Sequence, residues 1–296
     1  MILYDFCPSC GHKSIIPLFS TKDYTVSHKQ FEIWECKNCT LRFTQNVPDA
    51  EEIGAYYYSE NYISHTDTKE GFISLLYHNI RKHTLDQKRK LVEKETSKKR
   101  GSILDVGSGT GAFLNTMRKA AWEIKGLEPD EGARRKALEL YGLHLDISEE
   151  LFSLPGQSFD AITLWHVLEH VHELHAYITR LKELLRPGGI LFIAVPNYTC
   201  HDEKVYREHW AAYDVPRHLY HFSPASMHTF LSLHGLRLNA IKPMWYDSFY
   251  VSMLSEKYRT GKSNFLKACV EGGISNFKAL FNKEKCSSLI YLASAK

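Results

Sequence analysis

Four cysteines near the start of the chain are spaced for metal binding. Cys7 and Cys10 form one C-x-x-C pair, Cys36 and Cys39 form a second, and 25 residues separate the two pairs. Four thiolates arranged in this way fill the tetrahedral shell of a structural zinc ion. A redox pair instead sits at a helix start in a thioredoxin-like unit, a context that neither pair has. We therefore predict a zinc ribbon over residues 1–45, with zinc as a structural cofactor.

A second group suited to chemistry is a glycine-rich run preceded by Asp105. Glycines let the backbone approach a ligand closely and adopt positive φ angles. Dinucleotide enzymes use the spacing G-x-G-x-x-G against a pyrophosphate, whereas the spacing here is G-x-G-x-G. The acid would repel a pyrophosphate but would attract a cofactor with an amino group and a sulfonium. The predicted cofactor-binding residues of this loop are Asp105, Gly107, Ser108, Gly109 and Gly111.

Glu128, followed by Pro129, is the acidic partner of that loop. It lies 17 residues after Gly111, at the end of the next predicted strand. A carboxylate at this position accepts hydrogen bonds from both hydroxyls of a ribose, as it does in dinucleotide sites. We therefore predict that Glu128 and Pro129 belong to the cofactor site.

A cluster of titratable residues over 214–221 offers candidates for acid–base chemistry. A histidine that titrates near neutral pH suits the role of general base, and we assign it to His218. Arg217 either holds an anionic group of the substrate or pairs with Asp214. His218 and His221 share an alternative, which is to brace the helix that Ser223 caps.

The elements that position these residues alternate along the chain. Buried strands are predicted at 103–106, 122–128, 161–165 and 190–195. Helices are predicted at 71–94, 112–121, 131–141 and 167–185, the last one stopped by the Pro-Gly-Gly at 187–189. Strands that alternate with helices indicate a parallel sheet covered on both faces, and thus a Rossmann-like α/β fold.

The last third of the chain continues this pattern with an insertion. We predict a helix over 227–234, a strand over 236–241 and a final strand over 288–293. Residues 246–284 are expected to be helical, with breaks at Gly261 and at the pair Gly272 and Gly273. The predicted domains are the zinc ribbon at 1–45, a tyrosine-rich and helical linker at 46–100, and a catalytic domain at 101–296.

Residues 101–200 resemble the core of the class I S-adenosylmethionine-dependent methyltransferases. The resemblance is carried by five segments in the expected order, at 104–111, 126–129, 158–162, 166–170 and 185–189. It implies S-adenosylmethionine as cofactor and a seven-stranded sheet whose last strand, at 288–293, runs antiparallel between the fifth and sixth. It also implies that Trp165 and His166 line the pocket, that Ile147 and Ser148 lie near the adenine, and that His166 is a second catalytic candidate.

The segment 166–170 also fits the H-x-x-E-H pattern of inverted zinc peptidases. His166 and His170 would have to share one face of a helix to grip a zinc ion. His166 falls instead at a predicted strand–helix junction, so we reject this interpretation.

Composition and charge narrow the class of acceptor. The net charge of +3 argues against nucleic acid, because RNA and DNA reward a strongly basic face. No signal peptide and no apolar run long enough to span a membrane are found, which predicts a cytoplasmic protein.

The whole chain resembles bacterial methyltransferases of sugar and polysaccharide biosynthesis, which implies a small-molecule or glycan-like acceptor. The alternatives are an rRNA base methyltransferase that binds RNA through its zinc ribbon, and a retired methyltransferase fold that serves as an adaptor.

Overall fold

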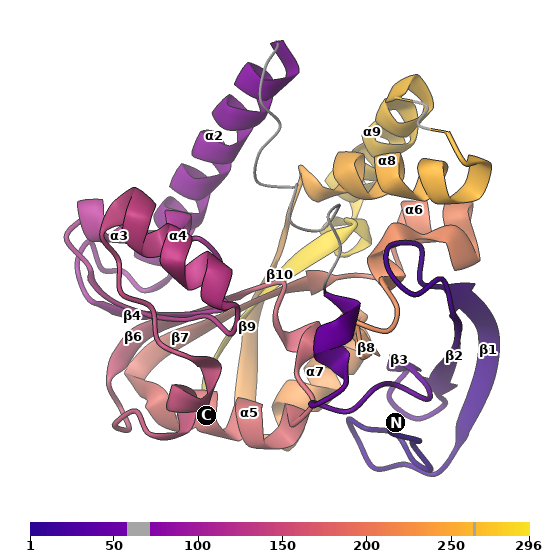
Figure 1. The fold of residues 1–296 in the computed structure, drawn as a ribbon. Coiled ribbons are helices and arrows are strands. Elements are labelled where there is room, and N and C mark those ends of the chain that lie inside the picture. The colour runs from indigo at the N-terminus through magenta and orange to yellow at the C-terminus, as the bar shows by residue number, and fades with distance from the viewer. Residues whose placement is uncertain (58–71, 263–264) are drawn as a thin grey trace. The chain divides into compact units, whose positions relative to one another are not determined.

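The computed structural model describes residues 1–57, 72–262 and 265–296 (Figure 1). Tyr58 and Tyr62 of the tyrosine-rich segment lie outside the described residues, so the linker is defined here only at its two ends. The chain divides into two compact units. The first comprises Met1–Ile63, Leu168–His175 and Ala194–Tyr291, and the second comprises Ser64–Val167, Ala176–Ile193 and Leu292–Lys296. The contiguous boundaries at 45 and 100 stay a prediction.

The main sheet has six strands in the order β5-β4-β6-β7-β10-β9. β4 pairs in parallel with β5 and with β6. Asn197, just after β7, donates to the carbonyl of Ser287, and Met244, just after β9, donates to that of Ser288. β10 therefore runs antiparallel between β7 and β9. The strands are β4 Ser102–Val106, β5 Glu123–Leu127, β6 Phe159–Trp165, β7 Leu185–Pro196, β9 Leu236–Pro243 and β10 Ser288–Ala295.

The strand count corrects one expectation, because the resemblance implied seven strands. The segment beyond β5 contributes a single parallel bridge between Leu127 and Asp146. Two backbone bonds accompany it: Asp146 donates to Gly126 and Glu128 donates to Asp146. One bridge does not make a strand, so the sheet ends at β5. The fold remains the predicted α/β arrangement, with the late antiparallel strand in its predicted place.

Four helices accompany the strands of the second unit: α2 Phe72–Glu95, α3 Ala112–Lys119, α4 Glu131–Tyr141 and α5 Leu174–Leu184. In Figure 1, α3 and α4 lie on one face of the strands and α5 on the other. α4 begins where the Asp130 side chain accepts from the Ala133 N–H and ends at Gly142 with φ 63°. These local signals explain why its predicted bounds match the observed ones.

The helix predicted over 167–185 is shorter than expected. A 3-10 turn, η4 Leu168–His170, follows β6, and α5 begins only at Leu174. The Pro-Gly-Gly at 187–189 lies inside β7, which begins directly after the helix at Leu185. The helix therefore ends at Leu184, three residues before Pro187, and the Pro-Gly-Gly segment belongs to the strand that follows.

The N-terminal residues form a separate four-stranded sheet in the order β1-β2-β3-β8. Its strands are β1 Ile15–Lys22, β2 Gln30–Cys36, β3 Arg42–Thr44 and β8 Tyr220–His221. The short β8 lies far along the chain and pairs antiparallel with β3. The first 45 residues thus share their sheet with the segment that carries the candidate His218 and Arg217.

The remaining elements of the first unit are mostly helical. They are η1 Ile53–Tyr56, α6 His201–Tyr206, η5 Arg207–His209, η6 Ala211–Tyr213, α7 Pro224–Leu233, α8 Asp247–Thr260, α9 Phe265–Phe281 and η7 Lys283–Lys285; the second unit adds the 3-10 turn η3 Ser148–Phe152. An aromatic core including Tyr206, Trp210 and Tyr213 lies among them. Among the described residues, no helix is both long and apolar enough to cross a membrane.

The predicted insertion over 246–284 is helical, but only one of its two predicted breaks exists. α8 ends where Gly261 adopts φ 72°. α9 instead runs through Gly272 and Gly273 without interruption. A Cβ at Gly272 would lie 2.9 Å from the Phe249 ring and 3.0 Å from its Cα, whereas one at Gly273 would meet nothing within 4 Å. Gly272 is therefore needed for close packing of α9 on α8.

The two glycines predict stability effects of opposite sign. Gly272→Ala should lower the free energy of unfolding by about 1–3 kcal/mol, because the new methyl group overpacks the helix contact. Gly273→Ala should raise it by up to about 1 kcal/mol through helix propensity alone. Urea denaturation of both variants measures this. Equal effects of the two substitutions would contradict the packing role of Gly272.

Candidate functional site

The glycine loop joins β4 to α3 and adopts a conformation that favours glycine. Gly107, Gly109 and Gly111 have φ angles of 69°, 54° and 76°. A Cβ at Gly107 would lie 2.4 Å from a methyl group of Val167. The three glycines therefore leave the loop without side chains at these positions, so a ligand can approach its backbone closely.

Asp105, the last residue but one of β4, places a buried carboxylate directly before this loop. Its Oδ1 accepts a hydrogen bond of 2.6 Å from the Thr163 hydroxyl on the neighbouring strand β6. Burial raises the pKa of Asp105 to about 7, although Thr163 and the charge of Lys88 oppose the rise. A buried carboxylate with a raised pKa favours a cationic ligand, because a nearby positive charge stabilises the ionised form of the carboxylate.

Glu128 follows β5 and bonds to the glycine loop directly. Its Oε2 accepts from the Gly109 N–H at 2.7 Å, and its Oε1 accepts from the Asp130 N–H at 3.0 Å. Burial raises the pKa of Glu128 above its ordinary value. Each carboxylate oxygen keeps a second acceptor position for a further donor. Arg134 donates to the backbone carbonyls of Glu128 and Pro129, which fixes the turn that holds the carboxylate.

The end of β6 adds an aromatic residue that sequence analysis assigned to the pocket. The Trp165 ring meets Phe113 edge to face, and the Lys88 ammonium lies 4.2 Å from its centroid. Among the described residues, nothing accepts a hydrogen bond from its buried indole N–H. The sequence did not predict Lys88 and Thr163 as residues of this site, because neither belongs to a motif. Their positions depend on how α2 and β6 pack.

The residues expected near an adenine lie beyond the single bridge at Asp146. Ile147 is 44% exposed and immediately precedes the 3-10 turn η3, which Ser148 begins. An exposed apolar side chain next to the end of β5 is suited to one face of a flat ring. Together, the bare loop, the two buried carboxylates and Ile147 fit a ligand with a cationic group, a ribose and a base, as S-adenosylmethionine has.

The rejected zinc-peptidase motif lacks its helix. His166 follows β6 directly and has a left-handed φ of 59°, and His170 lies in the 3-10 turn η4. The two histidines therefore do not share an α-helical face, as an H-x-x-E-H zinc site requires.

His170 instead belongs to a polar cluster in the first unit. Its Nδ1 lies 2.9 Å from the Tyr57 hydroxyl and 3.0 Å from the carbonyl oxygen of Arg217. Its ring meets that of His218 edge to face, with 4.6 Å between centroids. Burial, followed by the charge of His218, lowers the pKa of His170 to about 4. His170 is therefore neutral at pH 7.

His218 is oriented by a backbone contact. Its Nδ1 lies 2.8 Å from the Ala212 carbonyl, so Nδ1 carries the proton and Nε2 presents a lone pair. Nε2 lies 4.0 Å from Oδ2 of Asp214. Glu169, His170 and His218 each offer one carboxylate oxygen or ring nitrogen, and these three atoms lie within 4.8 Å of one another. Such a group of residue types suits a proton relay or a small metal site.

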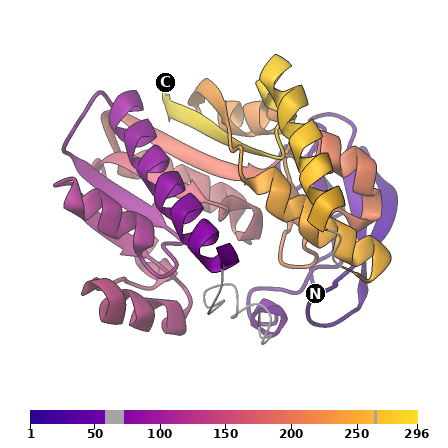
Figure 2. The ribbon, with the colours of Figure 1, turned by 90° about the horizontal axis from the view of Figure 1, so that it is seen from above.

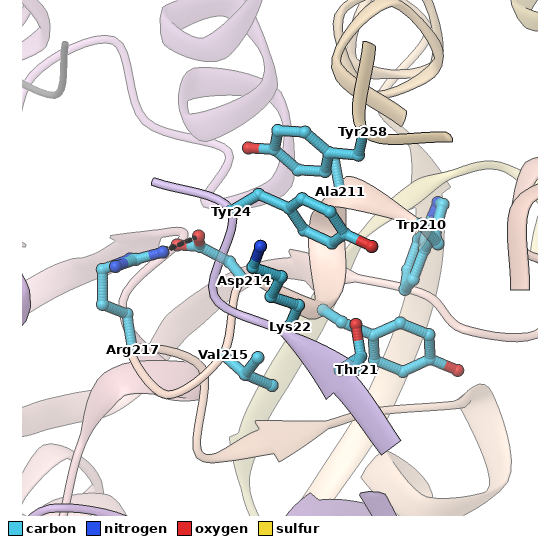
Figure 3. A pocket seen from close by; sticks show the side chains of 10 residues that line it. Thr21, Lys22, Tyr24, Trp210, Ala211, Asp214, Val215, Arg217 and Tyr258 are labelled. Carbon is cyan, nitrogen blue, oxygen red and sulfur yellow. Dashed lines mark hydrogen bonds and ion pairs between the residues drawn. The ribbon is translucent and has the colours of Figure 1, made fainter. Parts of the chain in front are cut away.

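Arg217 is held by buried ion pairs. Its guanidinium donates to both carboxylate oxygens of Asp214, at 3.0 and 2.6 Å (Figure 3). It also donates to Asp23 at 3.1 Å. A further bond reaches the Tyr56 carbonyl. The side chain is 1% exposed. Of its two predicted roles, the structure shows the ion pair with Asp214.

Beside this ion pair is a pocket with an empty volume of about 200 Å³, part of it open to solvent. It is smaller than the roughly 300 Å³ at which ligand pockets usually begin. Tyr24 and Tyr258 stack at its rim, with 4.3 Å between ring centroids (Figure 3).

The four N-terminal cysteines meet in one cluster. Cys7 and Cys39 have their sulfurs 3.6 Å apart, as do Cys10 and Cys36, and all four sulfurs lie within 4.8 Å of one another. A tetrahedron of thiolates about 2.3 Å from a zinc ion has edges of about 3.8 Å. The residues present therefore fit a four-thiolate metal site. Cys200, Cys269 and Cys286 do not belong to this cluster, and none of the seven cysteines forms a disulfide.

Comparison with known proteins places the chain in a family. Residues 77–241 match the model of the family described as "Methyltransferase domain". A "Ubiquinone biosynthesis O-methyltransferase" of Nitrosococcus oceani is 30% identical over 174 residues, which cover 54% of this chain and 71% of that protein. One of Dinoroseobacter shibae is 34% identical over 101 residues, 32% of this chain and 41% of that protein, so this chain spans less than half of that relative.

A solved structure shows the same fold. The magnesium protoporphyrin IX methyltransferase of Synechocystis, with bound SAH, is 15% identical and has a TM-score of 0.53 over 81% of this chain and 97% of that one. At this identity the likeness concerns the fold alone. The family match covers more than half of this chain, with the glycine loop and Glu128 inside it. The chain thus belongs to the methyltransferase-domain family.

Proposed function

We propose that this protein transfers a methyl group to a hydroxyl oxygen of a small molecule. The observation that supports cofactor binding is the hydrogen bond from the Gly109 N–H to Glu128, which joins the acidic residue to the glycine loop. The acceptor half is supported by the names of the relatives, which are O-methyltransferases of ubiquinone biosynthesis. The sugar or polysaccharide acceptor remains a prediction from sequence resemblance.

Each side of the cofactor site has a proposed task. Asp105 attracts the amino group, Glu128 accepts from the ribose hydroxyls, and Ile147 covers the adenine. Trp165 and His166 border the methyl group. When bound, S-adenosylmethionine supplies an electrophilic methyl group that a nucleophile takes by in-line displacement.

The acceptor hydroxyl must lose its proton as its oxygen forms the new bond. We assign the base to His218, because its Nδ1 is tied to a carbonyl and its Nε2 is thereby the proton-accepting atom. Asp214 would stabilise the imidazolium that results. His170, neutral at pH 7, keeps a second positive charge away from that ring. Arg217 then acts by holding Asp214 rather than by touching substrate.

We also propose that the cysteine cluster holds one structural zinc ion. Four protein ligands leave no position for water or substrate, so the metal stabilises the N-terminal sheet and takes no part in methyl transfer. Such a role is independent of RNA binding, which the alternative of an rRNA methyltransferase would require.

Cofactor binding tests the two carboxylates. Glu128→Gln should weaken S-adenosylmethionine binding roughly 10- to 100-fold, because charged hydrogen bonds to the ribose are lost. Glu131→Gln, an acid 75% exposed at the start of α4, is the matched control and should bind normally. Isothermal titration calorimetry measures both, and equal affinities of the two variants would contradict the assignment.

The pKa of Asp105 adds a pH dependence to the same measurement. Its folded pKa of about 7 lies above its ordinary value, so the carboxyl is protonated below pH 7 and charged above it. Affinity for the cationic cofactor should therefore rise between pH 6 and pH 8. Asp105→Asn should bind more weakly and lose this slope. A wild type whose affinity is flat across that range speaks against the role of Asp105.

Acceptor class and base are tested with a labelled methyl donor. Transfer to a cell metabolite extract should exceed transfer to total RNA. Once the acceptor is isolated, His218→Ala should reduce kcat roughly 100- to 10,000-fold with unchanged cofactor affinity. His228→Ala, an exposed histidine of α7, should keep full activity. Preferential labelling of RNA, or an active His218→Ala variant, would overturn the respective part of the proposal.

Metal analysis tests the zinc. Protein purified without chelators should contain one zinc ion per chain. Cys10→Ser should lose it and unfold at a lower temperature, because the metal bond contributes to folding. Cys269→Ser, a partly exposed cysteine of α9, should retain it. Metal-free wild type would refute the site.

A further inference from the structure

Helix α9 exposes large apolar side chains along one face. Leu266 is 78% exposed, Phe277 61% and Phe281 81%. At 100° per residue these positions fall within about one sixth of a turn, a single stripe along the helix. The full set of exposed large apolar residues on α9 is Leu266, Val270, Ile274, Phe277, Leu280 and Phe281.

The opposite face of α9 is built from small residues. Ala268, Gly272, Ser275 and Ala279 are buried, and they recur at the spacing of one helix face. The helix therefore approaches α8 closely through its small side, as the contact of Gly272 with Phe249 shows. A helix of a globular protein normally buries its large apolar residues. Here they point outward, so the pattern of the sequence serves something other than the core.

Positive charge surrounds this stripe. Residues 257–285 contain seven Lys or Arg and two Glu, an excess larger than the net charge of +3 for the whole chain. Lys267 and Lys278 lie at the border of the stripe on the helix circumference, where Lys267 pairs with Glu256 at 3.5 Å and the Lys278 ammonium lies 2.8 Å from Nδ1 of His201. Lys262 precedes α9, and Lys283 and Lys285 follow it. α8, which lies beside α9 (Figure 2), also exposes Tyr246, Phe249 and Tyr250.

The stripe is too narrow for a stable dimer interface. From Leu266 to Phe281 the helix is about 24 Å long and about 10 Å wide, a footprint of a few hundred Å². A stable pair of proteins buries about 800 Å² on each partner. An apolar stripe with lysines at its borders instead matches a lipid surface, where apolar side chains enter the acyl boundary and lysines meet anionic headgroups.

We propose that α9 is an interfacial helix that binds the protein to anionic lipid membranes. Leu266, Phe277 and Phe281 enter the boundary between headgroups and acyl chains. The lysines around the stripe contact lipid phosphates. The helix lies parallel to the membrane surface, because its small face stays packed against α8.

Flotation of the full-length protein with vesicles tests this. Vesicles of phosphatidylglycerol and phosphatidylcholine should carry the protein upward, and pure phosphatidylcholine should carry at least tenfold less. Raising the salt concentration should release it, because surface electrostatics is screened. The double variant Phe277→Ser/Phe281→Ser should bind the anionic vesicles at least tenfold more weakly. Both side chains are exposed, so the fold and cofactor affinity should be unchanged.

Two matched variants make the outcome decisive. Leu233→Ser removes a side chain of α7 that is 58% exposed and should leave vesicle binding unchanged. Lys262→Glu/Lys283→Glu should reduce binding to anionic vesicles while leaving the apolar stripe intact. Absence of wild-type binding, or equal binding of the double phenylalanine variant, overturns the proposal. It is also overturned if light scattering shows a dimer that this variant converts to a monomer.

Discussion

The bond from the Gly109 N–H to the Glu128 carboxylate is the interaction on which the proposed cofactor site depends. It links the loop after β4 to the end of β5, two strands that are neighbours in the sheet. Burial raises the pKa of both carboxylates, although the charges of Lys88 and Arg134 oppose the rise at Asp105 and Glu128 respectively. A cationic ligand with a ribose would therefore stabilise the ionised forms of both carboxylates.

Much of this site follows from local sequence. The glycine spacing, Asp105 and Glu128 are fixed by short-range requirements of backbone shape and strand ends, so the sequence predicts them directly. Lys88 and Thr163 depend on how α2 and β6 pack, which no motif encodes. Tyr57 and His170 meet through segments that are distant in the chain. Such contacts depend on tertiary structure, and pattern analysis does not reach them.

Two errors in the predicted fold concern where helices are interrupted. Gly272 and Gly273 were expected to break a helix, yet a helix tolerates glycine at a cost of about 1 kcal/mol when a close contact requires it. The segment 167–185 was expected to be one helix, yet a 3-10 turn and a new start at Leu174 divide it. At Gly272 tertiary packing outweighs local propensity, whereas α4, with a cap at each end, was predicted to the residue.

The truncation of the sheet at β5 affects how the protein behaves at high concentration. A strand at the margin of a sheet presents backbone groups that can recruit strands from other molecules, which is a route to aggregation. β5 has five residues and carries Glu123 and Lys125. Lys125 also forms an ion pair with Asp146, the residue of the single bridge. Short length, charge and this partial cover make β5 a poor template for further strands, so the six-stranded sheet that the described residues form resists growth at this edge.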